Sequence, residues 1–155
     1  MTPRLGEQDQ RAAIAFLSGP AAFGGGAPVQ RIDTHGAIVF LSGDRAFKLK
    51  RAVRLPYLDF STLEQRRAVC EAELRLNRRT APELYLAVRA IVRRPDGSVG
   101  FGPDGEVLDW VIEMRRFADA DLLDAVAERG ELSAALVRRL ADRIAAFHAE
   151  AEIVP

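Results

Sequence analysis

The sequence predicts an α+β fold, in which about five antiparallel strands form a sheet that carries one packed helix and is followed by further helices. Residues 29–53 alternate short strand-like runs with glycine-containing bends, as a meander of antiparallel strands does. Two more strand-like segments, 86–92 and 107–114, are joined through Asp-Gly turns. Apolar residues at helical spacing lie between the third and fourth strands and again after residue 118. This order predicts a lobe of sheet and helix, followed by the start of a helical region.

The composition is that of an ordinary globular protein. With 155 residues, 48% hydrophobic and 28% charged, the chain is long enough to bury a core. Its 22 basic and 22 acidic residues cancel, which excludes a global field that would attract nucleic acid or an anionic membrane. The single Cys70 excludes an intrachain disulfide and argues against a cysteine-based zinc site. The N-terminus lacks the apolar core of a secretory signal and no apolar stretch could span a bilayer, so we expect a cytoplasmic protein.

Three segments are expected along the chain: residues 1–26, 27–117 and 118–155. The first holds a short helix over residues 7–17 and three consecutive glycines, Gly24 to Gly26, which we interpret as a hinge. A phosphate-binding P-loop is rejected there, because no Gly-Lys-Ser/Thr follows the glycines and no strand precedes them. The third segment is predicted to form helices over residues 119–128 and 133–150.

The middle segment contains the expected sheet and its helix. Its first three strands are predicted over residues 29–34, 38–41 and 45–49. The helix is predicted over residues 61–79. A capping box between Ser61 and Glu64 would open this helix, and the Thr-Ala-Pro that follows would end it.

The two lysines of the chain are the first candidate functional residues. Of the 22 basic residues 20 are arginine, and both lysines, Lys48 and Lys50, lie in one strand-like segment. Lysine is a compact point charge on a thin stem, so it can pass between packed side chains to reach one phosphate or carboxylate oxygen. Chance placement is the open alternative. Because side chains alternate along a strand, Ala46, Lys48 and Lys50 are expected on one face, and Phe47 and Leu49 on the other.

Glu73 is the candidate partner of a lysine. At helical spacing it falls between two apolar groups of the helix over residues 61–79, where a carboxylate needs a cation to offset its desolvation. We therefore predict an ion pair between Glu73 and Lys48. The alternative is a half-exposed Glu73 that pairs with Arg66 or Asn77 on its own helix.

The last strand changes from apolar to polar over residues 110–116, just before a helical segment. Such a strand fits a hinge between two lobes, whose backbone amides and carbonyls would bind the edge of a flat base. It fits equally an edge strand with charged ends. The pattern alone leaves both interpretations open.

Several blocks of the chain match a known pattern in the right order: residues 34–50, 58–64, 70–79 and 81–86. These blocks resemble the front part of an aminoglycoside phosphotransferase-like bacterial family, whose members are commonly fused to a C-terminal P-loop kinase or AAA ATPase domain. The order of strands and helix is also that of the small lobe of protein-kinase-like folds. The resemblance extends from the first helix to Phe147 and His148. It implies a protein-kinase-like fold that transfers a phosphoryl group from ATP to an unidentified small-molecule acceptor.

Carried over one position at a time, the resemblance implies ATP-binding roles for particular residues. Lys48 matches the lysine that holds the nucleotide phosphates, Glu73 matches the helix glutamate that orients it, and Ala46 leaves room for the base. The remaining positions are His35 and Gly36 in the loop that would cover the phosphates, and Ile112, Glu113 and Met114 in the hinge. The single glycine of that loop departs from a glycine-rich phosphate clamp.

The catalytic half of such an enzyme is missing from the sequence. Phosphoryl transfer in this fold needs an aspartate on a catalytic loop and further ligands for Mg²⁺. In the family these lie on a His-Gly-Asp-type loop and a later Asp motif, but the only His-Gly here is followed by Ala37, and His148 lies beside an apolar helix stripe. The chain stops at Pro155, before such a site. We therefore expect a truncated or partial chain that binds ATP, holds no catalytic residue or metal ligand of its own, and has little turnover alone.

A second hypothesis is a non-catalytic, degenerate kinase lobe that serves as a binding, regulatory or self-associating module. It depends on the last predicted helix, whose apolar stripe would lack the neighbours that a full lobe supplies. The stripe comprises Leu136, Val137, Leu140, Ile144 and Phe147. Nucleic-acid binding through paired arginines such as Arg66-Arg67 is disfavoured, because the pairs are scattered and balanced by acidic residues, which indicates solvated faces. The expected partners are a nucleotide and a small-molecule acceptor, with neither nucleic acid nor a membrane.

Overall fold

The computed structural model describes residues 5–153, with side chains described from Gln10 onward. The chain divides into two compact units, Met1–Arg116 and Phe117–Pro155. The first helix belongs to the first unit, because Ala13 and Leu17 lie in the same buried core as Phe40 and Phe47 of the sheet. It does not form a separate segment with the glycines that follow it.

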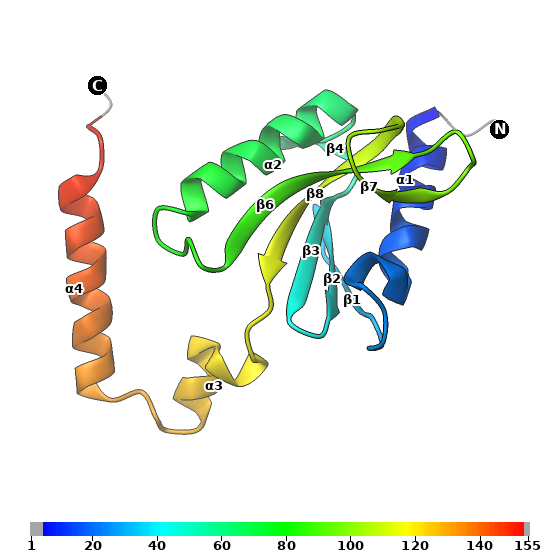
Figure 1. Ribbon diagram of the computed structural model, residues 1–155. Coiled ribbons are helices and arrows are strands. Elements are labelled where there is room, and N and C mark those ends of the chain that lie inside the picture. The colour runs from blue at the N-terminus through cyan, green and yellow to red at the C-terminus, as the bar shows by residue number, and fades with distance from the viewer. Residues whose placement is uncertain (1–4, 154–155) are drawn as a thin grey trace. The chain divides into compact units, whose positions relative to one another are not determined.

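A six-stranded sheet in the order β1-β2-β3-β8-β6-β7 forms the frame of the first unit, and every neighbouring pair is antiparallel (Figure 1). Its strands are β1 Gln30–Asp33, β2 Ala37–Ser42, β3 Arg45–Lys50, β6 Tyr85–Arg93, β7 Val99–Phe101 and β8 Glu106–Arg115. The other elements of this unit are helices α1 Leu5–Ser18 and α2 Leu63–Asn77, and a hairpin of β4 Arg54–Leu55 and β5 Leu58–Asp59. The predicted α+β class and antiparallel sheet are confirmed.

The prediction of about five strands is wrong, because β7 adds a sixth. This strand has three residues and follows a tight turn at Gly97, whose φ is 83°. A segment this short shows no alternation of apolar and polar residues from which a strand could be predicted. The β4 and β5 hairpin was not predicted for the same reason, since each of its strands has two residues.

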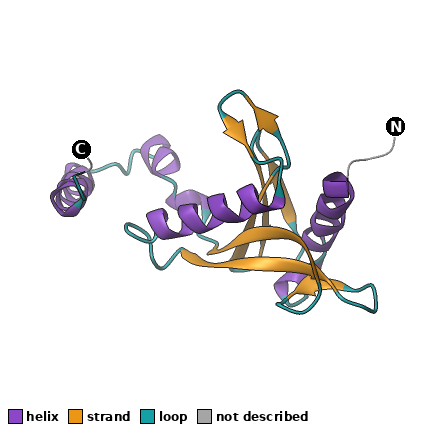
Figure 2. Ribbon diagram, turned by 90° about the horizontal axis from the view of Figure 1, so that it is seen from above, coloured by secondary structure: helices purple, strands orange, loops and turns teal. Residues whose placement is uncertain are grey.

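Helix α2 packs against β8 and β6 along one face of the sheet (Figure 2). Its N-cap is Thr62, whose Oγ1 accepts from the amide of Gln65 at 3.2 Å while Gln65 Oε1 accepts from the amide of Thr62 at 3.0 Å. The capping box predicted for Ser61 and Glu64 is therefore wrong by one residue. Both pairs fit the pattern, but Asp59 binds the amide and hydroxyl of Ser61, which leaves Thr62 to begin the helix.

Helix α1 and the 3₁₀ turn after it, Pro20–Phe23, pack on the opposite face of the sheet. Three consecutive glycines with positive φ, of 83°, 94° and 97°, then lead the chain from this turn toward β1. The core on this face contains Leu17, Phe40, Phe47, Leu49 and Val111, each at most 1% exposed. Phe47 and Leu49 thus lie on the α1 face as predicted, which leaves Lys48 and Lys50 on the α2 face.

The second unit consists of a 3₁₀ turn over Asp119–Asp121 and helices α3 Leu123–Glu128 and α4 Ala134–Glu150. Ser133 caps α4, since its Oγ accepts from the amide of Leu136 at 3.2 Å. Val137, Leu140 and Ile144 are 47%, 42% and 47% exposed, so an apolar side of α4 faces solvent as expected. Among residues 5–153, no helix has the length and apolar character needed to cross a membrane.

Candidate functional site

Lys48 and Glu73 meet where β3 and α2 pack together. Lys48 Nζ donates to Glu73 Oε1 at 2.7 Å, and the two side chains are 29% and 15% exposed. The predicted ion pair is therefore present. Because 25 residues separate the two positions, the pair depends on the packing of α2 against the sheet.

Lys50 binds the second oxygen of the same carboxylate, Glu73 Oε2, from a side chain that is 8% exposed. Its Nζ also lies 5.5 Å from the centroid of the Phe60 ring. Two ammonium groups thus share one carboxylate, and the cluster of Lys48, Lys50 and Glu73 carries one positive charge in excess. A half-buried excess positive charge attracts an anion.

The electrostatics of the cluster keep Glu73 ionised. Burial alone would raise the pKa of Glu73, but hydrogen bonds from Lys48 and Lys50 outweigh burial and hold the pKa below its usual range. Tyr85 lies near the same cluster. Burial raises the pKa of the Tyr85 hydroxyl and the charge of Glu73 raises it further, so Tyr85 stays a neutral phenol that can donate a hydrogen bond.

Helix α2 presents Arg66 and Glu73 on its sheet-facing side, two turns apart. The alternative in which Glu73 pairs with Arg66 or Asn77 is wrong. Asn77 Nδ2 donates to the backbone oxygen of Glu73 at 2.9 Å, not to its carboxylate. Arg66 binds a different carboxylate, that of Asp109.

An apolar strip lies beside Lys48 on the same face of the sheet. The β3 and β8 register places Ala46 opposite Met114 and Lys48 opposite Ile112. Residues directly opposite each other on antiparallel strands share a face. Three of the residues predicted to bind ATP, Ala46, Ile112 and Met114, therefore lie on the same face as Lys48. Ala46 and Ile112 are buried there, at 4% and 0% exposed.

The backbone role predicted for Ile112, Glu113 and Met114 is wrong. Strand β8 lies between β3 and β6, and these residues pair with both neighbours, so the sheet itself uses their amides and carbonyls. The edge-strand alternative is wrong for the same reason. The side chain of Glu113 lies on the α1 face, where it binds Arg45 and also Arg89 at 3.4 Å.

His35 and Gly36 lie in the turn between β1 and β2, as predicted, and that turn packs against β5. A Cβ on Gly36 would lie 3.2 Å from Leu58 Cδ2, and the Gly36 oxygen accepts from the amide of Arg51 at 3.0 Å. His35 is exposed, with its ring centroid 6.4 Å from that of Tyr57. The glycine therefore permits a close approach of the β5 hairpin.

Arg66 and Asp109 form a buried ion pair that the sequence patterns did not predict. Arg66 Nε donates to Asp109 Oδ1 at 2.8 Å, and the side chains are 2% and 0% exposed. The prediction of a solvated face is wrong for Arg66. Burial raises the pKa of Asp109 above the usual carboxyl range, against the opposing effect of Arg66. An aspartate within the apolar strand over residues 107–112 was the available signal, since a buried carboxylate needs a cation.

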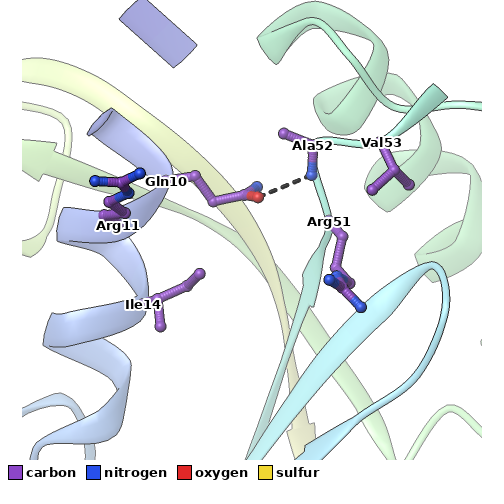
Figure 3. A pocket seen from close by; sticks show the side chains of 6 residues that line it. All are labelled: Gln10, Arg11, Ile14, Arg51, Ala52 and Val53. Carbon is purple, nitrogen blue, oxygen red and sulfur yellow. Dashed lines mark hydrogen bonds between the residues drawn. The ribbon is translucent and has the colours of Figure 1, made fainter. Parts of the chain in front are cut away.

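A hollow of about 280 Å³ lies between α1 and the end of β3, lined by Gln10, Arg11, Ile14, Arg51, Ala52 and Val53 (Figure 3). The side chain of Gln10 crosses it, and Gln10 Oε1 accepts from the amide of Ala52 at 2.8 Å. Gln10 Nε2 donates to the Lys50 oxygen at 3.0 Å and to Asp109 Oδ2 at 2.9 Å. The hollow therefore marks the place where α1 is joined to the strand that carries both lysines.

Metal ligands were expected outside this chain. Over residues 5–153, no group of three or more His, Cys, Asp or Glu side chains is arranged to hold a metal ion. The binding of Mg²⁺ by residues outside the chain stays a prediction.

The chain is similar to longer mycobacterial proteins. It is 34% identical over 120 residues to the uncharacterized protein Mb2027c of Mycobacterium bovis, and equally to the uncharacterized protein Rv2004c of Mycobacterium tuberculosis. The match covers 77% of this chain and 22% of each relative, so the chain spans less than a quarter of their length. No family model and no solved structure matches the chain.

Proposed function

We propose that this chain is the ATP-binding portion of a small-molecule phosphotransferase, a kinase that resembles the aminoglycoside phosphotransferases. The observation that carries the proposal is the ion pair of Lys48 and Glu73, which joins the third strand of the sheet to the helix packed on it. The order of β1, β2, β3, α2, β6 and β8 supports it, since the resemblance implies the same order.

Lys48 is the residue that would hold the phosphates. It is the more exposed of the two lysines, while Lys50 is buried against the same carboxylate. Lys50 therefore keeps Glu73 neutralised when Lys48 turns toward an anion, so phosphate binding need not leave a half-buried carboxylate unpaired. The flat base would lie along the strip of Ala46 and Met114.

The rest of the catalytic machinery would come from a longer protein. Phosphoryl transfer needs an aspartate that positions the acceptor hydroxyl and ligands that hold Mg²⁺ on the phosphates. Matching relatives are much longer than this chain, which supports a partial enzyme. With ATP as the donor, the reaction would take place in the cytoplasm, and the 155-residue chain alone would show little turnover.

Isothermal titration with ATP and Mg²⁺ tests the proposal. We expect binding by the wild-type chain, and binding at least about tenfold weaker in Lys48→Ala, because a charged hydrogen bond contributes roughly 1.5–3 kcal/mol. Arg67→Ala is the matched control, since Arg67 forms an exposed pair with Glu71 on α2 and should leave affinity unchanged. No binding by the wild-type chain, or equal affinity of Lys48→Ala, would contradict the proposal.

A second candidate function is a non-catalytic module that binds a partner or associates with itself, and the exposed apolar side of α4 favours it. Val137, Leu140 and Ile144 are each more than 40% exposed on that helix. Sedimentation analysis over a concentration series should then show self-association that Leu140→Glu abolishes. Lys48→Ala should leave that association unchanged, which separates this function from nucleotide binding.

A further inference from the structure

One buried carboxylate, that of Asp109, is bound by a side chain from each of the two helices that pack on the sheet. Arg66 of α2 donates to its Oδ1 at 2.8 Å, and Gln10 of α1 donates to its Oδ2 at 2.9 Å. Asp109 is 0% exposed, so its carboxylate is shielded from solvent while both contacts are in place. The two helices are therefore connected through one strand residue.

Gln10 also fixes the end of the strand that carries the lysines. Its Nε2 donates to the Lys50 backbone oxygen at 3.0 Å, and its Oε1 accepts from the Ala52 amide at 2.8 Å. Both amide hydrogens and the carbonyl oxygen of the side chain are thus used. A single side chain of α1 contacts β3, the segment after it, and β8.

Arg66 fixes the rotation of α2 about its own axis. Besides Asp109, its guanidinium donates to the backbone oxygens of Phe60 and Ser61 at 3.0 and 3.3 Å. Glu73 follows Arg66 by seven residues, which is about two helical turns, so both project from the same side of α2. A rotation of α2 that moved Arg66 away from Asp109 would also move Glu73 away from Lys48.

We propose that α1 is a clamp on the lysine and glutamate cluster: Gln10, through Asp109 and Arg66, holds α2 in the rotation that presents Glu73 to Lys48. Gln10 and Asp109 are then positioning residues of the site. The clamp itself is a property of the fold, and only its effect on nucleotide affinity rests on the proposed function. Loss of the contact from Gln10 would loosen α2 without removal of any side chain of the cluster.

The direct test is a titration of the Glu73 carboxyl by carbon-13 NMR in the wild-type chain and in Gln10→Ala. We expect the pKa of Glu73 to rise in Gln10→Ala, because its contacts with both lysines weaken. Ser42→Ala is the matched control, since it also removes a buried side-chain hydrogen bond, 3.1 Å from Ser42 Oγ to the Ala27 oxygen, but at the opposite end of β2 and β3. A general loss of stability would affect both variants alike.

The proposal is overturned if Glu73 titrates at the same pH in Gln10→Ala and in the wild-type chain, or if Ser42→Ala shifts it equally. Asp109→Asn is the second variant. Because it also removes a negative charge, its effect is measured by hydrogen exchange of the α2 amides, which should be faster than in the wild-type chain. Near-ultraviolet circular dichroism of Trp110 shows whether each variant keeps its fold. Hydrogen exchange of the α2 amides should be faster in Gln10→Ala than in Ser42→Ala.

Nucleotide titrations of the same variants separate this inference from the proposed function. A loosened site should bind ATP roughly two- to thirtyfold more weakly in Gln10→Ala, the range expected for coupling through a packed network. If no protein binds ATP but the pKa of Glu73 moves, the clamp stands and the proposed function fails. If Gln10→Ala binds ATP as the wild-type chain does and the pKa of Glu73 is unchanged, the clamp fails and the proposed function stands.

Discussion

Lys50 and Glu73 form the more buried half of a shared ion pair, in which a lysine that is 8% exposed occupies the carboxylate oxygen that Lys48 leaves free. Lys48 is 29% exposed and binds the other oxygen. The two lysines are two residues apart on β3 and reach the same acceptor because alternation places them on one face. Their difference in burial predicts a division of roles between stability and binding.

Replacement of the buried lysine should cost more stability than replacement of the exposed one. In Lys50→Ala the Glu73 carboxylate loses its buried partner, so the free energy of unfolding should fall by about 1–3 kcal/mol. Lys48→Ala should lower it by less, because Glu73 keeps Lys50 and water reaches the gap. Urea denaturation of both variants measures the difference, and an equal or reversed order would contradict this division.

The buried pair of Arg66 and Asp109 should behave as one unit. Arg66→Ala leaves a buried carboxylate without a cation, which should lower the free energy of unfolding by about 3–5 kcal/mol. The double variant Arg66→Met/Asp109→Leu removes both charges and should be more stable than Arg66→Ala alone. Denaturation curves for the wild-type chain, Arg66→Met, Asp109→Leu and the double variant give the coupling energy. Additive effects of the single substitutions would show that the two side chains act independently.

Acidification should remove the stability that Glu73 contributes. The pKa of Glu73 is lower in the fold than the ordinary value of 4.5, so its contribution is present above pH 4.5 and is lost as the pH falls through the lower, folded value. Glu73→Gln should therefore be less stable than the wild-type chain at neutral pH, and the difference should shrink below pH 4.5. Asp109 has a raised pKa, so its contribution to stability changes with pH in the opposite direction. Both proteins contain Asp109, so this contribution cancels when their stabilities are compared. A difference that stays constant with pH would contradict the prediction.

Cys70 should be unreactive in the folded chain. It is 0% exposed on α2, and burial raises the pKa of its thiol to about 12, so almost no thiolate exists at neutral pH. A colorimetric thiol reagent should react with it only at the rate of unfolding, and quickly in urea. Rapid modification of the native chain would mean that α2 opens from the sheet far more often than its packing implies.

Local sequence patterns predicted most of the fold. Alternation in β3, turn residues at the bends and a capping signal near residue 62 all depend on neighbours within a few positions, so the sequence alone contains them. The capping box was misplaced by one residue because Ser61 and Thr62 satisfy the same pattern, and only the contact of Ser61 with Asp59 distinguishes them. The three-residue strand β7 was missed because it is too short to show a period.

The ion pair at the centre of the candidate site was predictable, since a carboxylate in an apolar helix stripe needs a cation. Its full geometry was not. Alternation places Lys50 on the same face as Lys48, but whether Lys50 also reaches Glu73 depends on how closely α2 approaches β3. The hinge role predicted for Ile112, Glu113 and Met114 is wrong because β8 is a central strand, whose backbone amides and carbonyls bond to strands on both sides. The order of strands depends on the whole sheet and is not visible in one segment.

The residues themselves determined that this chain forms an antiparallel sheet with a helix on it, and that Lys48 has an acidic partner on that helix. Those features follow from periodicity and from the cost of desolvating one carboxylate. The tertiary structure alone decided that α1 covers the other face and that Gln10, Arg66 and Asp109 meet, across 99 and 43 residues of sequence. Contacts at such separations depend on how whole helices and strands pack, and a local sequence pattern does not contain that information.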